Sequence, residues 1–96
     1  MLEATPLERE ILNDIQNRTG MTFHKIGGID TRNKQIADAI LPILAEWVER
    51  IDDRHHRHAI YARFHLNNAQ AHFNSASADS AADLGALLLL VAFSYS

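Results

Sequence analysis

The chain has 96 residues, with nine lysines and arginines, twelve aspartates and glutamates, and no cysteine. This length suits one small domain, and the missing cysteines exclude disulfides, thiolate zinc sites and a cysteine nucleophile. The formal net charge of -3 is too mild to indicate a strongly polyanionic partner. The N-terminal stretch MLEATPLERE is acidic and has no apolar run, so we expect no signal peptide and a cytoplasmic location.

The first predicted element is a helix that opens at Pro6. Thr5 offers an N-cap, Pro6 suits the first helical position, and Glu8 is placed to complete a capping box. Gly20 predicts the end of this helix, because glycine readily adopts the left-handed conformation that closes helices. One apolar stripe runs along the helix at helical spacing, through Leu7, Ile11, Leu12 and Ile15.

The stretch MTFHKIGGIDTRN, residues 21–33, shows no clean strand pattern. The Gly27-Gly28 pair breaks any regular element. We therefore expect a short helical or irregular connector that turns Phe23, Ile26 and Ile29 toward the core.

Residues 34–51 carry the strongest periodic signal in the chain and predict an amphipathic helix. Pro42 is unusual there, because an interior proline removes one backbone hydrogen bond at a cost of about 3 kcal/mol. We expect Trp47 to lie in the core and Asp52-Asp53 to end this helix and cap the next. The predicted apolar face comprises Ile36, Ile40, Ile43, Leu44, Trp47, Val48 and Ile51.

A further helix is predicted over residues 53–66. Its expected inward face holds Ile60 and Phe64, with His56 partly buried beside them. The alanines of this helix allow close approach to a neighbour. The following stretch, residues 67–83, is rich in small polar residues and predicts a long loop with weak helical tendency.

The segment ADLGALLLLVAF, residues 82–93, predicts a last buried helix. Its apolar run of residues 84–93 is too short to span a bilayer, which takes about 20 residues, so we expect no membrane partner. Such an apolar end has no obvious cover. We expect either self-association through this segment or a chain that is a fragment of a longer repeat array.

The run ILPILAEWVERIDD, followed at once by RHHRHAIYARF, resembles a HEAT-like repeat of the small bacterial type. The resemblance covers about residues 7–66, with the helical pair at about 34–66. It departs from the usual pattern at Arg54, where a proline is common, and at His56, where an aliphatic residue is common. The positions that match are Pro42, Trp47, Asp52, Asp53, Ile60 and Phe64.

The resemblance implies an all-α fold in which antiparallel helical hairpins pack as a short α-α bundle or solenoid. It also implies a protein-interaction function without a cofactor. We expect residues 1–96 to form a single helical domain. Glu46, Glu49, Asp52 and the histidines are candidates for acid-base chemistry, but the sequence identifies no nucleophile and no Gly-rich phosphate loop, so we expect no enzymatic activity.

Residues 54–72 hold five of the six histidines, three arginines and no carboxylate. A basic, aromatic-bearing helix face of this kind can meet an acidic protein or a phosphate backbone, or it can be an ordinary solvated helix face. The alternative is a divalent metal site at His55 and His58, which would need a further ligand such as Asp52 or His24. Nucleic acid ranks below both, because the chain is net acidic. The predicted contact residues are Arg50, Arg54, Arg57, His58, Tyr61 and His65, and we assign no metal ligand.

Overall fold

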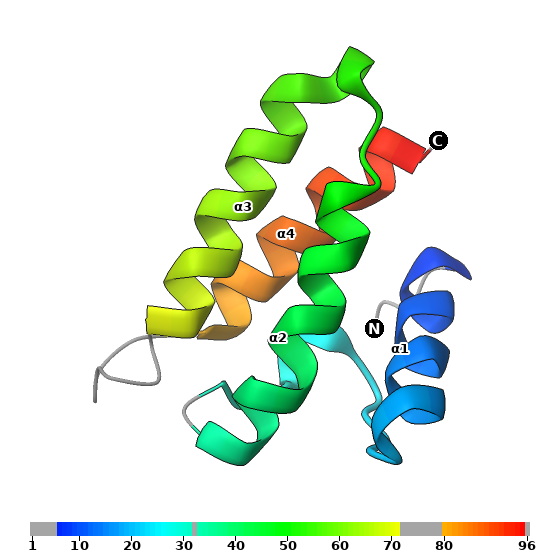
Figure 1. The fold of residues 1–96 in the computed structure, drawn as a ribbon, viewed down its shortest axis with the longest axis vertical. Coiled ribbons are helices and arrows are strands. Elements are labelled where there is room, and N and C mark those ends of the chain that lie inside the picture. Colours follow the sequence, from blue (N-terminus) through cyan, green and yellow to red (C-terminus); the bar gives the residue numbers. More distant parts are fainter. Residues whose placement is uncertain (1–5, 32, 72–79, 96) are drawn as a thin grey trace.

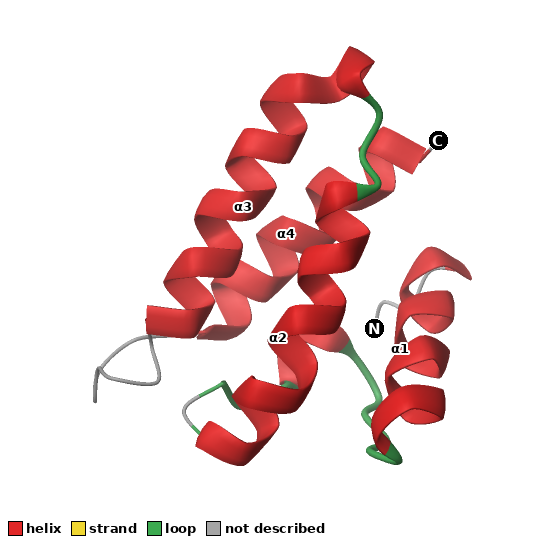
Figure 2. Ribbon diagram, in the orientation of Figure 1, coloured by secondary structure: helices red, strands yellow, loops and turns green. Residues whose placement is uncertain are grey.

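The computed structural model describes residues 6–31, 33–71 and 80–95, and this part of the chain is helical without any strand (Figures 1 and 2). The predicted all-α class is therefore confirmed. The elements in chain order are α1 (Pro6–Thr19), the 3-10 turn η1 (Ile26–Gly28), α2 (Lys34–Glu49), the 3-10 turn η2 (Asp53–His55), α3 (His56–Ala71) and α4 (Ser80–Tyr95).

Helix α1 begins and ends where the sequence indicates. Pro6 is its first residue, and the predicted cap at Thr5 lies outside the described residues. Gly20 closes the helix with a φ of 77°, and its N–H donates to the Gln16 carbonyl at 2.8 Å. The side chains of Ile11 and Ile15 are fully buried, as the apolar stripe predicts.

The connector between α1 and α2 is held to the core, as expected. Ile26 and Ile29 are buried and Phe23 is half-buried against the core. The Glu8 carboxylate accepts a hydrogen bond from the Ile26 N–H at 3.0 Å, which ties the connector back to α1. The turn η1 in addition contacts α4.

Helix α2 supplies the largest share of the aliphatic core. Asn33 caps it, because its side chain accepts from the N–H groups of Gln35 and Ile36. Pro42 lies inside the helix and its side chain is exposed. The expectation that Trp47 belongs to the core is confirmed. The other buried side chains of α2 are Ala37, Ile40, Leu41, Ile43, Leu44 and Val48.

The turn η2 reverses the chain, so that α3 runs back alongside α2 (Figure 1). Asp52 caps this turn as predicted, since its carboxylate accepts from the Arg54 N–H at 3.0 Å. Two parts of the predicted loop are wrong, because α3 continues to Ala71 and α4 already begins at Ser80. Residues 72–79 lie outside the described part of the chain.

The predicted inward face of α3 is wrong. Ile60 and Phe64 are 51% and 56% exposed, and His56 is exposed as well. The side of α3 that we predicted to face inward is therefore largely exposed. The side chains that α3 buries instead are Ala62, Leu66 and Ala69.

Helix α4 explains why α3 buries its smaller side chains, because α4 packs closely along α3 (Figure 1). The small side chains of Ala62 and Ala69 allow the two helices to approach closely. Helix α4 fills the core with Leu84, Leu87 and Val91, which are fully buried. Much of the apolar segment for which we expected self-association or a longer repeat array is covered within the chain, although Leu89 is 63% exposed.

The end of α4 also contacts α2. The Tyr95 hydroxyl donates to the Trp47 carbonyl at 2.9 Å, and the two rings lie 5.7 Å apart. Burial raises the pKa of the Tyr95 hydroxyl. No helix among the described residues has both the length and the apolar character that crossing a membrane requires.

Candidate functional site

Two of the predicted contact residues face the interior. The Nδ1 atom of His65 lies 2.9 Å from the Asp83 carboxylate, and that of His58 lies 3.3 Å from the Ser94 hydroxyl. Both partners belong to α4, and both histidines are half-buried. His58 and His65 therefore join α3 to α4 instead of forming an open contact surface.

Two predicted contact residues lie at the connection between α2 and α3, Arg50 at the end of α2 and Arg54 in the turn η2. The Arg50 guanidinium lies over the Trp47 ring, 5.0 Å from its centroid. The Arg54 Nε atom lies 3.3 Å from the Asp52 carboxylate. Both arginine side chains remain more than half exposed, so their charges face solvent.

Arg57 and Tyr61 are the predicted residues that lie openly on α3. Both are exposed, and Tyr61 is 56% exposed. They occupy positions i and i+4 of the same helix, so their side chains are neighbours on its surface. The six predicted residues are thus divided between the turn, the open side of α3 and the contact with α4.

Beside Arg57 and Tyr61 lies a shallow hollow that the sequence analysis missed. We call this surface the outer face of α3; Figure 1 shows α3 at the edge of the molecule. The hollow has a volume of about 460 Å³ and belongs to α3 alone. Its lining residues are His56, Ala59, Ile60, Arg63, Phe64 and Asn67.

Sequence reasoning missed the hollow because it assigned Ile60 and Phe64 to the core. A competing signal was present in the chain. Ala62, Leu66 and Ala69 also recur at helical spacing, at positions i, i+4 and i+7. Comparing the two stripes would have raised the alternative that the larger side chains face outward.

The charge of the molecule is divided unevenly between α3 and the rest. Residues 54–71 contain three arginines and no carboxylate. The rest of the chain holds the other six of the nine basic residues and all twelve of the acidic residues. The segment therefore carries +3 and the remainder -6, so the exposed apolar side chains of α3 lie on a helix whose own charged side chains are all basic.

One ion pair connects this surface to α2. Arg63 lies 3.8 Å from Glu49, and the two side chains are 52% and 64% exposed. Such exposed pairs contribute roughly 0–1 kcal/mol, because water and salt screen them. The Arg63 guanidinium can thus exchange this partner for another carboxylate at small cost.

The histidine pair proposed as a metal site is close in space. The rings of His55 and His58 are stacked, with centroids 5.3 Å apart and an interplanar angle of 1°. Two imidazoles provide half of a tetrahedral zinc site. Within residues 6–31, 33–71 and 80–95, no group of three or more histidine, aspartate or glutamate side chains is arranged to hold a metal ion.

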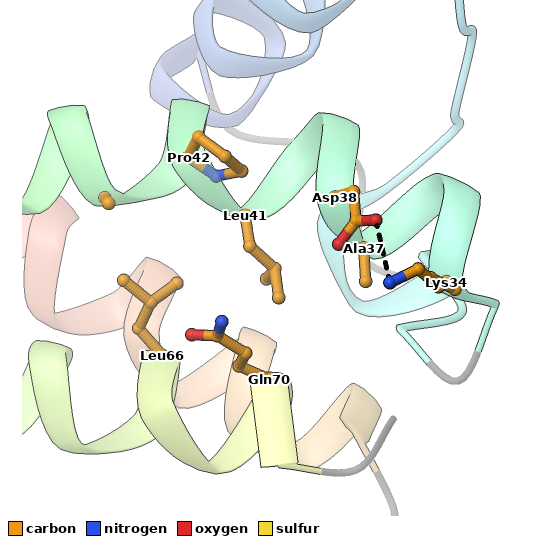
Figure 3. Close-up of a pocket in the computed structure, with 8 residues that line it drawn as sticks. Lys34, Ala37, Asp38, Leu41, Pro42, Leu66 and Gln70 are labelled. Carbon is orange, nitrogen blue, oxygen red and sulfur yellow. Dashed lines mark ion pairs between the residues drawn. The ribbon is translucent and has the colours of Figure 1, made fainter. Parts of the chain in front are cut away.

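A second hollow lies between α2 and α3 (Figure 3). It has a volume of about 410 Å³, and Leu41 and Leu66 point toward each other across it. At its edge Lys34 and Asp38 pair at 3.6 Å, so the nearby charges already neutralise each other. The remaining lining residues are Ala37, Pro42, Ala45 and Gln70.

Charged side chains of α1 and α2 form hydrogen bonds between these two helices. Asp14 accepts a hydrogen bond from the Trp47 indole N–H at 3.0 Å, and Arg18 bonds to Glu46. The hydrogen bond from Arg18 lowers the pKa of the Glu46 carboxyl. These contacts hold α1 against α2 and orient Trp47.

A scan against protein-family models and searches among curated proteins and solved structures gave no match to this chain.

Proposed function

We propose that this chain is a non-enzymatic protein-interaction module of HEAT-like type, which meets its partner through the cationic side of α3. The observation that carries the proposal is the exposure of three large side chains, Ile60, Tyr61 and Phe64, on a helix without a carboxylate. Exposed apolar side chains that cluster together are characteristic of interaction surfaces. Aromatic residues and arginine are also enriched at such surfaces.

The HEAT-like part of the proposal concerns how α2 and α3 are used. An apolar helix containing Pro42, an acidic turn at Asp52-Asp53 and a basic second helix follow the order expected of such a repeat. In this interpretation the pair is one hairpin of a short α-α array. The module binds by shape and charge and needs no cofactor.

The function is tested by selecting peptides from a display library against the full chain. We expect enriched sequences that bind the chain in solution, and weaker binding once both Arg57 and Tyr61 are replaced by alanine. Both residues are exposed, so circular dichroism should show an unchanged fold. A library that yields no binder above background would contradict the proposed function.

A second candidate function rests on the stacked rings of His55 and His58. A divalent metal bound there would recruit its remaining ligands from water or another molecule. Calorimetry with zinc or nickel distinguishes this candidate from the first. Saturable binding of about one ion per chain, lost when both histidines are replaced by alanine, would favour a metal-binding role.

A further inference from the structure

We propose that the outer face of α3 docks an acidic amphipathic helix of another protein. This inference rests on the proposed interaction function and names the partner's chemistry. It follows from the spacing of the residues around the hollow, from their charge, and from the composition of the other exposed faces.

The hollow has the geometry of a helix-packing surface. Its lining forms two overlapping sets of four residues, each with the spacing i, i+3, i+4 and i+7. Four residues with this spacing form the hole that receives one side chain, or knob, of a packed helix. The outer face therefore offers two consecutive holes. The first is His56, Ala59, Ile60 and Arg63, and the second is Ile60, Arg63, Phe64 and Asn67.

The composition of the two holes sets the chemistry of the knobs. Ile60 belongs to both holes and Phe64 to the second, and each is about half exposed. Ala59 is small and half-buried, which leaves room for an incoming side chain. Two apolar knobs, one helical turn apart, would cover this apolar surface.

The charges around the holes determine which charged residues should lie beside the knobs of the partner helix. Arg63 belongs to both holes, and Arg57 is exposed on the same helix. The ion pair between Arg63 and Glu49 is long, and both of its side chains are exposed. Carboxylates beside the partner's knobs would therefore meet arginines that are accessible to them.

A second copy of this chain fits poorly as the occupant. Two copies of the outer face would bring like charges together. In the described part of the chain, the large exposed apolar side chains outside α3 are Leu89 and Tyr95, both on α4. The exposed faces of α1 and α2 carry carboxylates without such knobs. No described face thus combines two exposed apolar knobs with acidic flanks.

The test is a titration of the isotope-labelled full chain with a designed peptide, followed by NMR. The peptide has about 20 residues, enough to form a helix, with leucine at positions i, i+4 and i+7 and glutamate beside them. We expect saturable shifts of the backbone amides of residues 56–67. A peptide of the same pattern with lysine in place of glutamate should bind at least about tenfold more weakly.

Variants of the chain separate the apolar from the charged contribution. Phe64→Ser should weaken binding of the acidic peptide about tenfold, because Phe64 forms a wall of the second hole. Arg57→Glu should weaken it severalfold. Leu89→Ser is the matched control, since it removes an exposed apolar side chain from α4, and it should leave the affinity unchanged. All three positions are exposed, so thermal melts should confirm intact folding.

Several results would overturn the inference. Equal binding of the lysine and glutamate peptides would show that the partner need not be acidic. Shifts confined to the second hollow, between α2 and α3, would show that the peptide binds there and not on the outer face of α3. Shifts at residues 56–67 that grow with protein concentration and without peptide would assign the face to a second copy. Saturable binding of a DNA duplex in place of the acidic peptide would assign it to nucleic acid. If the display library yields binders but the designed peptide does not bind, this inference fails while the proposed function stands.

Discussion

Helices α2 and α3 have the same length and lie side by side, yet they use their large apolar residues in opposite ways. Helix α2 buries Ile40 and Leu44 completely, whereas α3 leaves Ile60 and Phe64 about half exposed. The comparison shows that periodicity fixes the inward face of a helix when a single apolar stripe is present. Helix α3 has two apolar stripes, and the stripe with the smaller side chains is the one that faces the core.

The reason lies in what the smaller stripe can do. Ala62 and Ala69 let α4 approach closely, and α4 brings Leu84, Leu87 and Val91 into the core. The polar residues that come inside with this stripe are satisfied, because His65 meets Asp83 and His58 meets Ser94. The larger residues of α3 are left outside, where they form the candidate surface.

The largest expected effect on the free energy of unfolding comes from replacing a core residue of α2, and we compare it with the replacement of an exposed residue of α3. Leu44→Ala should lower the free energy of unfolding by about 2–5 kcal/mol, because it leaves a cavity at a fully buried site. Phe64→Ala should change it by no more than about 0.5 kcal/mol, despite removing a larger side chain. Denaturant unfolding measures both. A larger loss for Phe64→Ala than for Leu44→Ala would show that the packing of α3 described above is wrong.

The next effect tests the close contact between α3 and α4. Ala62→Leu should lower the free energy of unfolding by about 1–3 kcal/mol, because Ala62 is fully buried and a leucine must push the helices apart. Asn67→Leu, on the exposed side of α3, adds a leucine without this penalty. Thermal and denaturant unfolding of the two variants should diverge. Equal stability would mean that α4 leaves space beside Ala62.

A smaller effect concerns the polar link between α3 and α4. Removing the carboxylate with Asp83→Ala should cost about 1–2 kcal/mol of unfolding free energy, because the part-buried His65 loses a bonded acceptor. The matched change in α2, Asp38→Ala, breaks an exposed pair with Lys34 and should cost less than about 0.5 kcal/mol. A double-mutant cycle of Asp83→Ala with His65→Ala should show coupling between them; additive losses would argue against the contact.

The smallest effect concerns the turn that joins α2 to α3. The backbone hydrogen bond from Arg54 lowers the pKa of the Asp52 carboxyl, and the Arg54 charge adds to this. Because the folded pKa is below the unfolded one, the carboxylate's contribution is complete above the unfolded pKa and disappears as the pH falls through the folded pKa. An NMR titration of the carboxyl should report the lowered value. A titration at the ordinary aspartate value would contradict the cap.

The sequence alone determined that the chain forms these four helices, and it determined both limits of α1. Pro6 and Gly20 mark the limits of α1, Asp52 caps the turn η2, and the apolar face of α2 is the one that the structure buries. These features are local, because a cap or a glycine turn depends on the backbone within a few residues. A single strong stripe such as that of α2 is also decided locally, since no other face of the helix can enter the core.

Only the tertiary structure decided which side of α3 faces inward, where α3 ends, and hence where the candidate surface lies. Ile60 and Phe64 look like core residues along the chain, and the position of α4 leaves them exposed. The arginines of the predicted site are on the surface, but two of its histidines are turned toward Asp83 and Ser94. These features depend on contacts between residues that are 18 to 36 positions apart in the sequence. Local periodicity carries no information about such contacts, in which close packing and satisfied polar groups are balanced.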